Sequence, residues 1–142
     1  MIKGACHCGN IEYRLKWPPD QPVVPVRACD CSFCRKHGAA WTSNPEAELR
    51  ICLRDPGKIA PYRFGTNTAD FHVCSRCGVV PFVSCEYDGR MYAVVNVNTF
   101  HDAEGVSMAR STASFGSEDA ADRLDRRKRN WISDVAMTYR YG

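Results

Sequence analysis

The sequence has no long hydrophobic stretch and little excess charge. None of its apolar runs approaches the roughly 18–20 apolar residues that a membrane-spanning helix needs, and its first residues, Met1 to Gly4, lack the apolar core of a signal peptide. The net charge is only +3, from 19 Lys and Arg against 16 Asp and Glu, which is too small to indicate a nucleic-acid-binding protein. We therefore expect a cytoplasmic chain with neither membrane nor nucleic-acid partners.

Internal repeats, low-complexity tracts and convincing linkers are also missing from the sequence. With 142 residues, of which 44% are hydrophobic, the chain has the length and composition of one globular domain. The Pro-rich segment 18–22 is short enough to be a loop within that domain. The sequence thus predicts a single domain over residues 1–142.

Cysteine is the residue type in excess, with nine copies. An odd number in a chain with no export signal is a poor basis for a disulfide framework, because reducing compartments keep thiols free. Seven of the nine fall in three tight groups, which are Cys6-His7-Cys8, Cys29-Asp30-Cys31-Ser32-Phe33-Cys34 and Cys74-Ser75-Arg76-Cys77. Clustering of this kind is typical of metal-binding or catalytic thiols.

The first and third groups together predict a closed site with four thiolates. Residues i and i+2 of an extended segment point to the same side, so Cys6 and Cys8 can present two sulfurs together. The two sulfurs of a Cys-x-x-Cys turn, here Cys74 and Cys77, also converge. A glycine follows each pair directly, and glycine permits the positive φ that lets a chain wrap around an ion. Four thiolates suit tetrahedral zinc in a structural role.

The middle group differs because it offers three cysteines and no fourth one nearby. Cys29, Cys31 and Cys34 supply three ligands, and three protein ligands with an open position are the pattern of a reactive zinc site. We therefore expect two zinc ions per chain, one for each set of cysteines. A distant side chain could instead close the second site, and the candidates are Cys52, Cys85, His7, His37, His72 and His101.

Basic residues flank the middle group. Arg27 precedes it, and Arg35 and Lys36 follow it. A zinc ion with three thiolates carries net negative charge, which nearby cations stabilise, and the same cations could hold the carboxylates of an anionic thiol. We treat these three residues as candidate substrate-binding residues, with an ordinary exposed basic loop as the alternative.

Hydrophobic patterning predicts a mainly β chain. Apolar and polar residues alternate, or apolar residues run together, at residues 10–16, 23–27, 49–53, 79–86 and 91–97. The last two segments are joined by Tyr87-Asp88-Gly89-Arg90, and Asp-Gly between apolar runs is a hairpin signal.

One helix is expected near the C-terminus. Ser117 can cap it, and Ala120, Leu124, Trp131 and Val135 recur at helical spacing along one face. We interpret the basic run at residues 126–129 as a solvent-exposed face of this helix and not as a nucleic-acid site.

The cysteine groups and their neighbours resemble the glutathione-dependent formaldehyde-activating family. In order over about residues 1–102, the matching segments are Gly4-Ala5-Cys6-His7-Cys8-Gly9, Cys29-Asp30-Cys31-Ser32-Phe33-Cys34-Arg35-Lys36, Gly38-Ala39-Ala40-Trp41, Tyr62-Arg63-Phe64-Gly65, Cys74-Ser75-Arg76-Cys77-Gly78 and Val95-Asn96-Val97-Asn98-Thr99. The resemblance implies folded-over antiparallel sheets, called a β-tent. It also implies a structural zinc on Cys6, Cys8, Cys74 and Cys77 and a second zinc on Cys29, Cys31 and Cys34.

The same resemblance implies a carbon–sulfur lyase activity that condenses glutathione with formaldehyde to S-hydroxymethylglutathione. A free thiol, with a pKa near 8.5, is mostly protonated at neutral pH, whereas a thiol that coordinates zinc is deprotonated. Glutathione sulfur would then be the fourth ligand beside Cys29, Cys31 and Cys34. These cysteines would be ligands and not nucleophiles.

Two other functions stay open at this point. One is a non-enzymatic zinc module that carries a thiol or binds a protein partner, because a fold does not determine a function. The other is a thiol-based reductase of the methionine sulfoxide type, for which only Cys52 and Cys85 remain as nucleophiles. Cys52 alternates onto the face of Arg50 and Arg54 and is the more exposed candidate, whereas Cys85 has the spacing of a core thiol.

Overall fold

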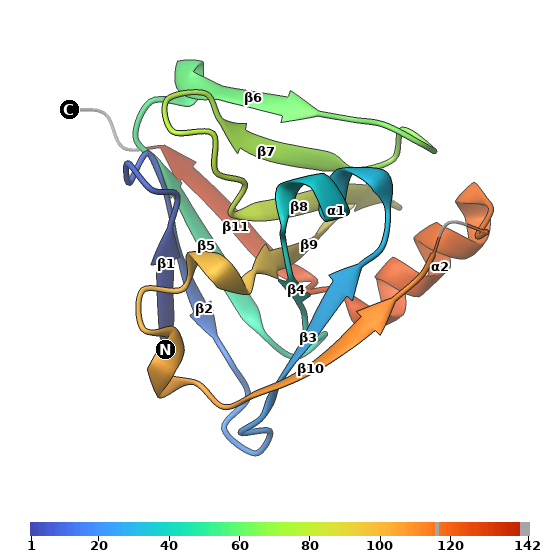
Figure 1. The fold of residues 1–142 in the computed structure, drawn as a ribbon, viewed down its shortest axis with the longest axis horizontal. Helices are drawn as coiled ribbons and strands as arrows, with labels where there is room; N and C mark the ends of the chain where they lie inside the picture. Colours follow the sequence, from blue (N-terminus) through green and yellow to red (C-terminus); the bar gives the residue numbers. More distant parts are fainter. Residues whose placement is uncertain (116, 140–142) are drawn as a thin grey trace.

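The computed structural model describes residues 1–115 and 117–139. Within these residues the strands form two sheets (Figure 1). In spatial order, the smaller sheet contains β1 (Ile2–Ala5), β2 (Ile11–Lys16), β5 (Glu48–Leu53) and β11 (Asp134–Tyr139). The larger sheet contains β10 (Met108–Ala113), β3 (Val24–Cys29), β4 (Trp41–Thr42), β9 (Arg90–Asn96), β8 (Phe82–Tyr87), β7 (Asp70–Cys74) and β6 (Ile59–Tyr62).

Helices are short and few in the described part of the chain. The α-helices are α1 (Ser32–His37) and α2 (Ala120–Asn130), and the 3-10 turns are η1 (Pro56–Lys58), η2 (Val97–Thr99) and η3 (Ala103–Gly105). The mainly β fold with a helix near the C-terminus is therefore confirmed. None of the helices in the two described ranges is both long and apolar enough to cross a membrane.

The alternating segments become strands with one buried face. On β2 and β5, the alternate residues are buried and pair across the antiparallel register, as Ile11 with Leu53, Tyr13 with Ile51 and Leu15 with Leu49. Removing such apolar side chains from water is the main driving force for folding. The expected hairpin is also present, since Tyr87 pairs with Arg90 and both turn residues, Asp88 and Gly89, have positive φ.

Two strands pair in a way that the alternation did not predict. β10 pairs with β3 and β11 pairs with β5, and both pairs are parallel, whereas every other strand pair in the described residues is antiparallel. Both strands lie at sheet edges and are largely exposed. Edge strands of this kind bury few side chains, so their sequences carry little period-2 signal.

The C-terminal helix differs from its sequence prediction at both ends. Its N-cap is Asp119, which accepts a hydrogen bond from the backbone N–H of Asp122 at 2.8 Å, so Ser117 is not the cap. Trp131 caps the C-terminus, and Val135 lies in β11. The helix stops because Ile132 and Ala93 exchange two backbone hydrogen bonds of 2.9 and 3.0 Å, which tie the chain to β9.

Gly4 permits a close approach between β1, β2 and the η2 turn. The Tyr13 hydroxyl, bonded to Thr99 Oγ1 at 2.7 Å, occupies the space where a Cβ on Gly4 would stand, and that Cβ would also lie 2.5 Å from the Thr99 carbonyl oxygen. We expect Gly4→Ala to lower the free energy of unfolding by at least about 2 kcal/mol, because overpacking forces backbone shifts. Denaturant titration measures this loss. Gly57→Ala is the control, since its Cβ would meet only the Asp55 side chain at 3.2 Å; an equal loss in both variants would contradict the steric argument.

Candidate metal centres and the adjoining cavity

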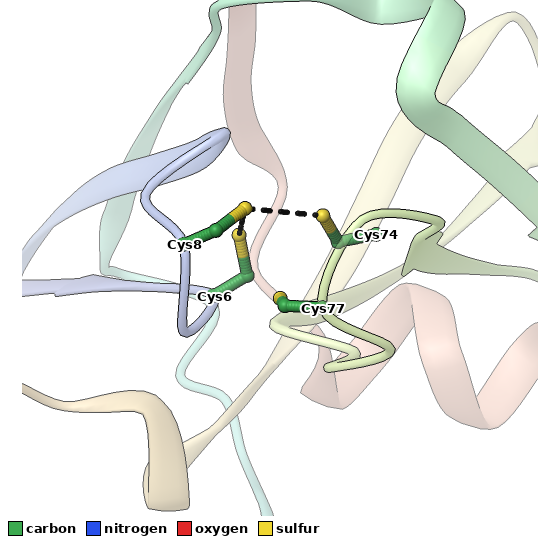
Figure 2. A group of neighbouring side chains, drawn as sticks. All are labelled: Cys6, Cys8, Cys74 and Cys77. Atoms are coloured by element: carbon green, nitrogen blue, oxygen red, sulfur yellow. Dashed lines mark hydrogen bonds between the residues drawn. The ribbon is translucent and has the colours of Figure 1, made fainter.

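Four cysteines meet where the two sheets come together. Cys6 and Cys8 lie in the loop after β1, while Cys74 ends β7 and Cys77 lies in the turn that follows (Figure 2). The four sulfurs all lie within 4.8 Å of one another. Because β1 and β7 belong to different sheets, an ion held by these sulfurs would join the two sheets.

The spacing of these sulfurs matches a tetrahedral metal site. Cys8 Sγ lies 3.8 Å from Cys6 Sγ and 3.6 Å from Cys74 Sγ. A zinc–sulfur distance of about 2.3 Å places the sulfurs of a tetrahedron about 3.8 Å apart. A disulfide would need about 2.05 Å, and the cysteines are free. The donor set therefore fits zinc.

Backbone conformation and burial both prepare this group for an ion. Gly9 and Gly78 have φ of 83° and 80°, and their N–H groups donate to the carbonyls of Cys6 and Cys74. Burial raises the pKa of the Cys6 thiol to about 12. Burial also acts to raise the pKa of Cys77, but backbone N–H groups and neighbouring thiols outweigh it and lower that pKa to about 6. Cys6 and Cys77 thus differ in how readily each loses its proton.

The other three clustered cysteines lie around a short helix that the sequence patterning did not predict. Cys29 ends β3, Cys31 is the N-cap of α1, and Cys34 lies within α1. The Cys31 sulfur accepts from the backbone N–H of Cys34 at 3.3 Å, and Trp41 Nε1 donates to the Cys34 sulfur at 3.4 Å. All three sulfurs lie within 4.8 Å of one another, so this donor set also fits a metal ion.

No fourth Cys, His, Asp or Glu joins this group among residues 1–115 and 117–139. The six distant candidates lie elsewhere. His72 bonds Ser84 and stacks on Phe82 in the core, and His37 stacks on Phe33. Cys85 is buried with 2% exposure, as its spacing predicted, and Cys52 lies half-buried on β5. The exposed His7 and His101 are likewise outside the group.

Cys29 and Cys34 differ in how readily each loses its proton. The hydrogen bond from Cys34 lowers the pKa of Cys29, an effect that burial partly opposes. The same bond, together with burial, raises the pKa of Cys34. One thiolate stabilised by its neighbours is a ready first ligand, and a bound cation would release the remaining protons.

A cavity of about 120 Å³ adjoins the three sulfurs. Its apolar wall is formed mainly by Trp41, Phe64, Phe71, Val83, Val94 and Trp131. Its charged wall contains Arg27, Arg123, Arg126 and Arg127. The arrangement places sulfur ligands, apolar surface and guanidinium groups around one space.

The three basic residues singled out in the sequence lie in different places. Arg27 lines the cavity and donates to Ser43 Oγ at 2.8 Å. Burial, and next the positive charge of Arg126, lower the pKa of Arg27, and the nearby Cys29 acts to raise it. Arg35 and Lys36 are exposed on α1. Lys36 lines a second, more open cavity with Phe33, His37, Tyr62 and Phe64, and Arg35 lines neither cavity.

The interpretation of residues 126–129 as a solvent-exposed face is wrong for two of the four. Arg127 is only 6% exposed, and Arg126 is half-buried with its guanidinium 3.6 Å from the centre of the Phe115 ring. Lys128 and Arg129 are exposed, as predicted. Helical spacing could have predicted this burial, because residues 123, 126 and 127 share one helix face.

The fold and the two cysteine groups define a mainly β protein with two candidate metal centres, one between the sheets and one beside a cavity. The chain belongs to the family of the glutathione-dependent formaldehyde-activating enzyme, whose model matches residues 1–116.

Two relatives illustrate the likeness. A Halomonas elongata protein named for glutathione-dependent formaldehyde activation is 30% identical over 97 residues, which are 54% of this chain and 52% of that protein. The chain thus spans about half the length of this curated relative. A crystal structure of a Rhodobacter sphaeroides protein is 30% identical, covers 75% of this chain and 99% of its own, and superposes with a TM-score of 0.55.

Proposed function

We propose that this protein is a zinc-dependent carbon–sulfur lyase that joins glutathione to formaldehyde. The observation that carries the proposal is the group of Cys29, Cys31 and Cys34, which has three sulfurs, no fourth ligand in the described residues and a cavity beside it. The family and the name of the Halomonas relative support the choice of thiol and aldehyde.

The cysteines of the middle group would hold the zinc, and their role is that of ligands. When bound there, zinc supplies a coordination position at which an incoming thiol loses its proton at neutral pH. Trp41 keeps Cys34 oriented through its Nε1 hydrogen bond, and the N–H of residue 34 orients Cys31. These contacts hold the sulfurs in place before substrate arrives.

The reaction makes one carbon–sulfur bond. The glutathione thiolate adds to the carbonyl carbon of formaldehyde, the carbonyl π electrons move to oxygen, and that oxygen takes up one proton, so that thiol and aldehyde atoms are all retained in S-hydroxymethylglutathione. The apolar wall around Trp41, Phe71 and Val94 limits water near the reacting atoms. Once the thiol is deprotonated, holding the two reactants together supplies the rest of the effect, because a thiolate adds to formaldehyde without a further catalytic group.

Arg27 is the proposed contact for a glutathione carboxylate, since it lines the cavity beside Cys29. Arg35 and Lys36 remain proposed substrate contacts from the sequence, and they lie on the outer side of α1. The four-sulfur group of Cys6, Cys8, Cys74 and Cys77 is the proposed structural zinc site, for which the join between the two sheets is the support.

Glutathione binding tests the proposal directly. We expect it to release about one proton near neutral pH, because the bound sulfur is a thiolate, and to strengthen the sulfur-to-metal charge-transfer band of cobalt placed in the middle site. Calorimetry in two buffers of different ionisation enthalpy counts the proton. S-methylglutathione is the control, since it keeps the carboxylates but has no thiol. If glutathione neither releases a proton nor alters the cobalt spectrum while metal is present, the alternative of a zinc-binding module without thiol chemistry replaces this function.

Metal content is the second test. We expect two zinc ions per freshly reduced chain, one for each cysteine group. Elemental analysis with a protein assay gives the ratio. One tightly held zinc would remove the support for a reactive centre at Cys29, Cys31 and Cys34, and none would contradict the metal function altogether.

A further inference from the structure

Helix α2 brings more positive charge to the wall of the cavity than the neighbouring carboxylates neutralise. Three of the four guanidinium groups that line it come from this helix, namely those of Arg123, Arg126 and Arg127. Helix α2 lies after residue 116 and so outside the residues that match the family model. Figure 1 shows it beyond the arrowheads of β3 and β10, the end of the larger sheet where Cys29 lies.

A single carboxylate serves two of these arginines. Glu118 accepts three hydrogen bonds from Arg126, at 2.9, 3.0 and 3.1 Å, and lies 3.9 Å from Arg123 Nε. Arg123 also donates to the carbonyl of Phe115 at 2.6 Å. Glu118 therefore anchors the start of α2 and neutralises one positive charge of the pair.

Neither Arg127 nor Arg27 is paired with a carboxylate of the described residues. Among the ion pairs formed within residues 1–115 and 117–139, none includes either residue. Arg127 donates to Thr68 Oγ1 at 2.8 Å and to the buried sulfur of Cys85 at 3.5 Å, and its Nε is buried without a partner. Arg27 donates to the Ser43 hydroxyl, which in turn donates to the carbonyl of Asn130 at the end of α2.

Burying an uncompensated guanidinium is costly, and a buried charge is normally paired. Arg27 lines the cavity beside Cys29, whereas Arg127, within the described residues, donates to a hydroxyl and a thiol and lies over the face of Trp131, 4.9 Å from its ring centre. A planar guanidinium with a free N–H is shaped to bind a carboxylate. The apolar walls of the cavity are thus joined by two guanidinium groups that no carboxylate of the described residues neutralises.

We propose that Arg127 and Arg27 form an anion site that selects thiol substrates carrying a carboxylate, with the sulfur directed to the cysteine group and the carboxylate to α2. This inference rests on the proposed function for the identity of the reacting group. The anion site itself needs neither the thiol nor the aldehyde. A neutral thiol of the same size would leave both guanidinium groups without a carboxylate partner.

Ligands without a thiol test the site separately from the chemistry. The probes are S-methylglutathione and 3-(methylthio)propionate, each compared with its methyl ester, and the measurement is calorimetric affinity for the metal-loaded protein. We expect at least one acid to bind at least roughly tenfold more tightly than its ester, since a charge-assisted contact is lost in the ester. The inference is overturned if neither acid binds, or if the esters bind equally well.

Variants then assign the site to its residues. Arg127→Gln and Arg27→Gln should each lower the affinity for the acid by roughly tenfold or more and leave the affinity for the ester unchanged. Arg129→Gln is the matched control, since it removes the same charge from the same helix at an exposed position outside the cavity. Arg127→Lys retains charge in case the glutamine variant does not fold, and it should bind the acid more weakly than wild type because the planar fork is gone.

Metal content distinguishes this site from simple charge balance around the thiolates. If Arg127→Gln loses metal but binds the acid as well as wild type, the arginine serves the metal and the inference fails. If the acids bind through Arg127 but glutathione fails the proton-release test, the anion site stands and the proposed reaction falls. If glutathione reacts but the binding of the acids does not depend on Arg127, the proposed reaction stands and the anion site is wrong.

Discussion

Cys77→Ala is expected to remove the cooperative unfolding transition and most of the soluble protein. Cys77 is one of four sulfurs that meet between two different sheets, where the proposed structural zinc would join them. Structural zinc contributes about 10–16 kcal/mol in zinc-finger peptides at neutral pH, which is comparable with the whole stability of about 5–15 kcal/mol of an ordinary domain. Thermal melts followed by circular dichroism, together with soluble yield, measure the effect.

Cys52→Ala is the matched control for that experiment. Cys52 is also a half-buried cysteine, but it lies on β5 and outside both sulfur groups. We expect the control variant to melt within a few degrees of wild type, because it loses one small side chain. Equal melting of Cys77→Ala and Cys52→Ala would show that the four-sulfur group does not hold the sheets together.

Cys34→Ala is expected to leave the fold intact and to abolish the thiol chemistry. Its ligand partners Cys29 and Cys31 lie on the same local segment, so losing this centre opens no link between the sheets. The variant should hold one zinc, at the four-sulfur group. We expect the glutathione-dependent rate to fall at least about 100-fold, because metal activation of a nucleophile is worth several kcal/mol.

Exchange NMR of glutathione and formaldehyde measures this rate above the uncatalysed background, and melting curves recorded on the same sample report the fold. Cys52→Ala is a suitable control here too, since Cys52 lies on β5 in the smaller sheet and belongs to neither sulfur group. A Cys34→Ala protein that melts normally and keeps the full rate would refute the role of the middle group.

The spacing of residues in the sequence predicted those structural features that depend only on neighbouring residues. Alternation along β2 and β5 predicted their buried faces, and Asp88-Gly89 predicted the hairpin between β8 and β9. These features hold because side chains two residues apart share a strand face, and because a two-residue hairpin needs positive φ at both positions.

Cysteine spacing likewise determined how the thiols divide into a group of four and a group of three. The spacing of i and i+2 and the Cys-x-x-Cys turn bring sulfurs together in pairs whatever the rest of the chain does. In the structure, the pair after β1 and the pair at β7 face each other between the two sheets. This agrees with the pattern, because one pair alone supplies only two of the four ligands that tetrahedral zinc needs.

Only the tertiary structure decided where the charges of α2 point. In the sequence, residues 126–129 are four consecutive basic residues with no sign of which are buried. The return of the chain at Ile132, which pairs with Ala93, sets the rotation of the helix and directs Arg127 inward. The parallel pairings of β10 and β11 were decided in the same way. Such contacts join residues far apart in the chain. They depend on which surfaces remain unpaired after the local elements have formed, and short-range sequence patterns carry no information about that.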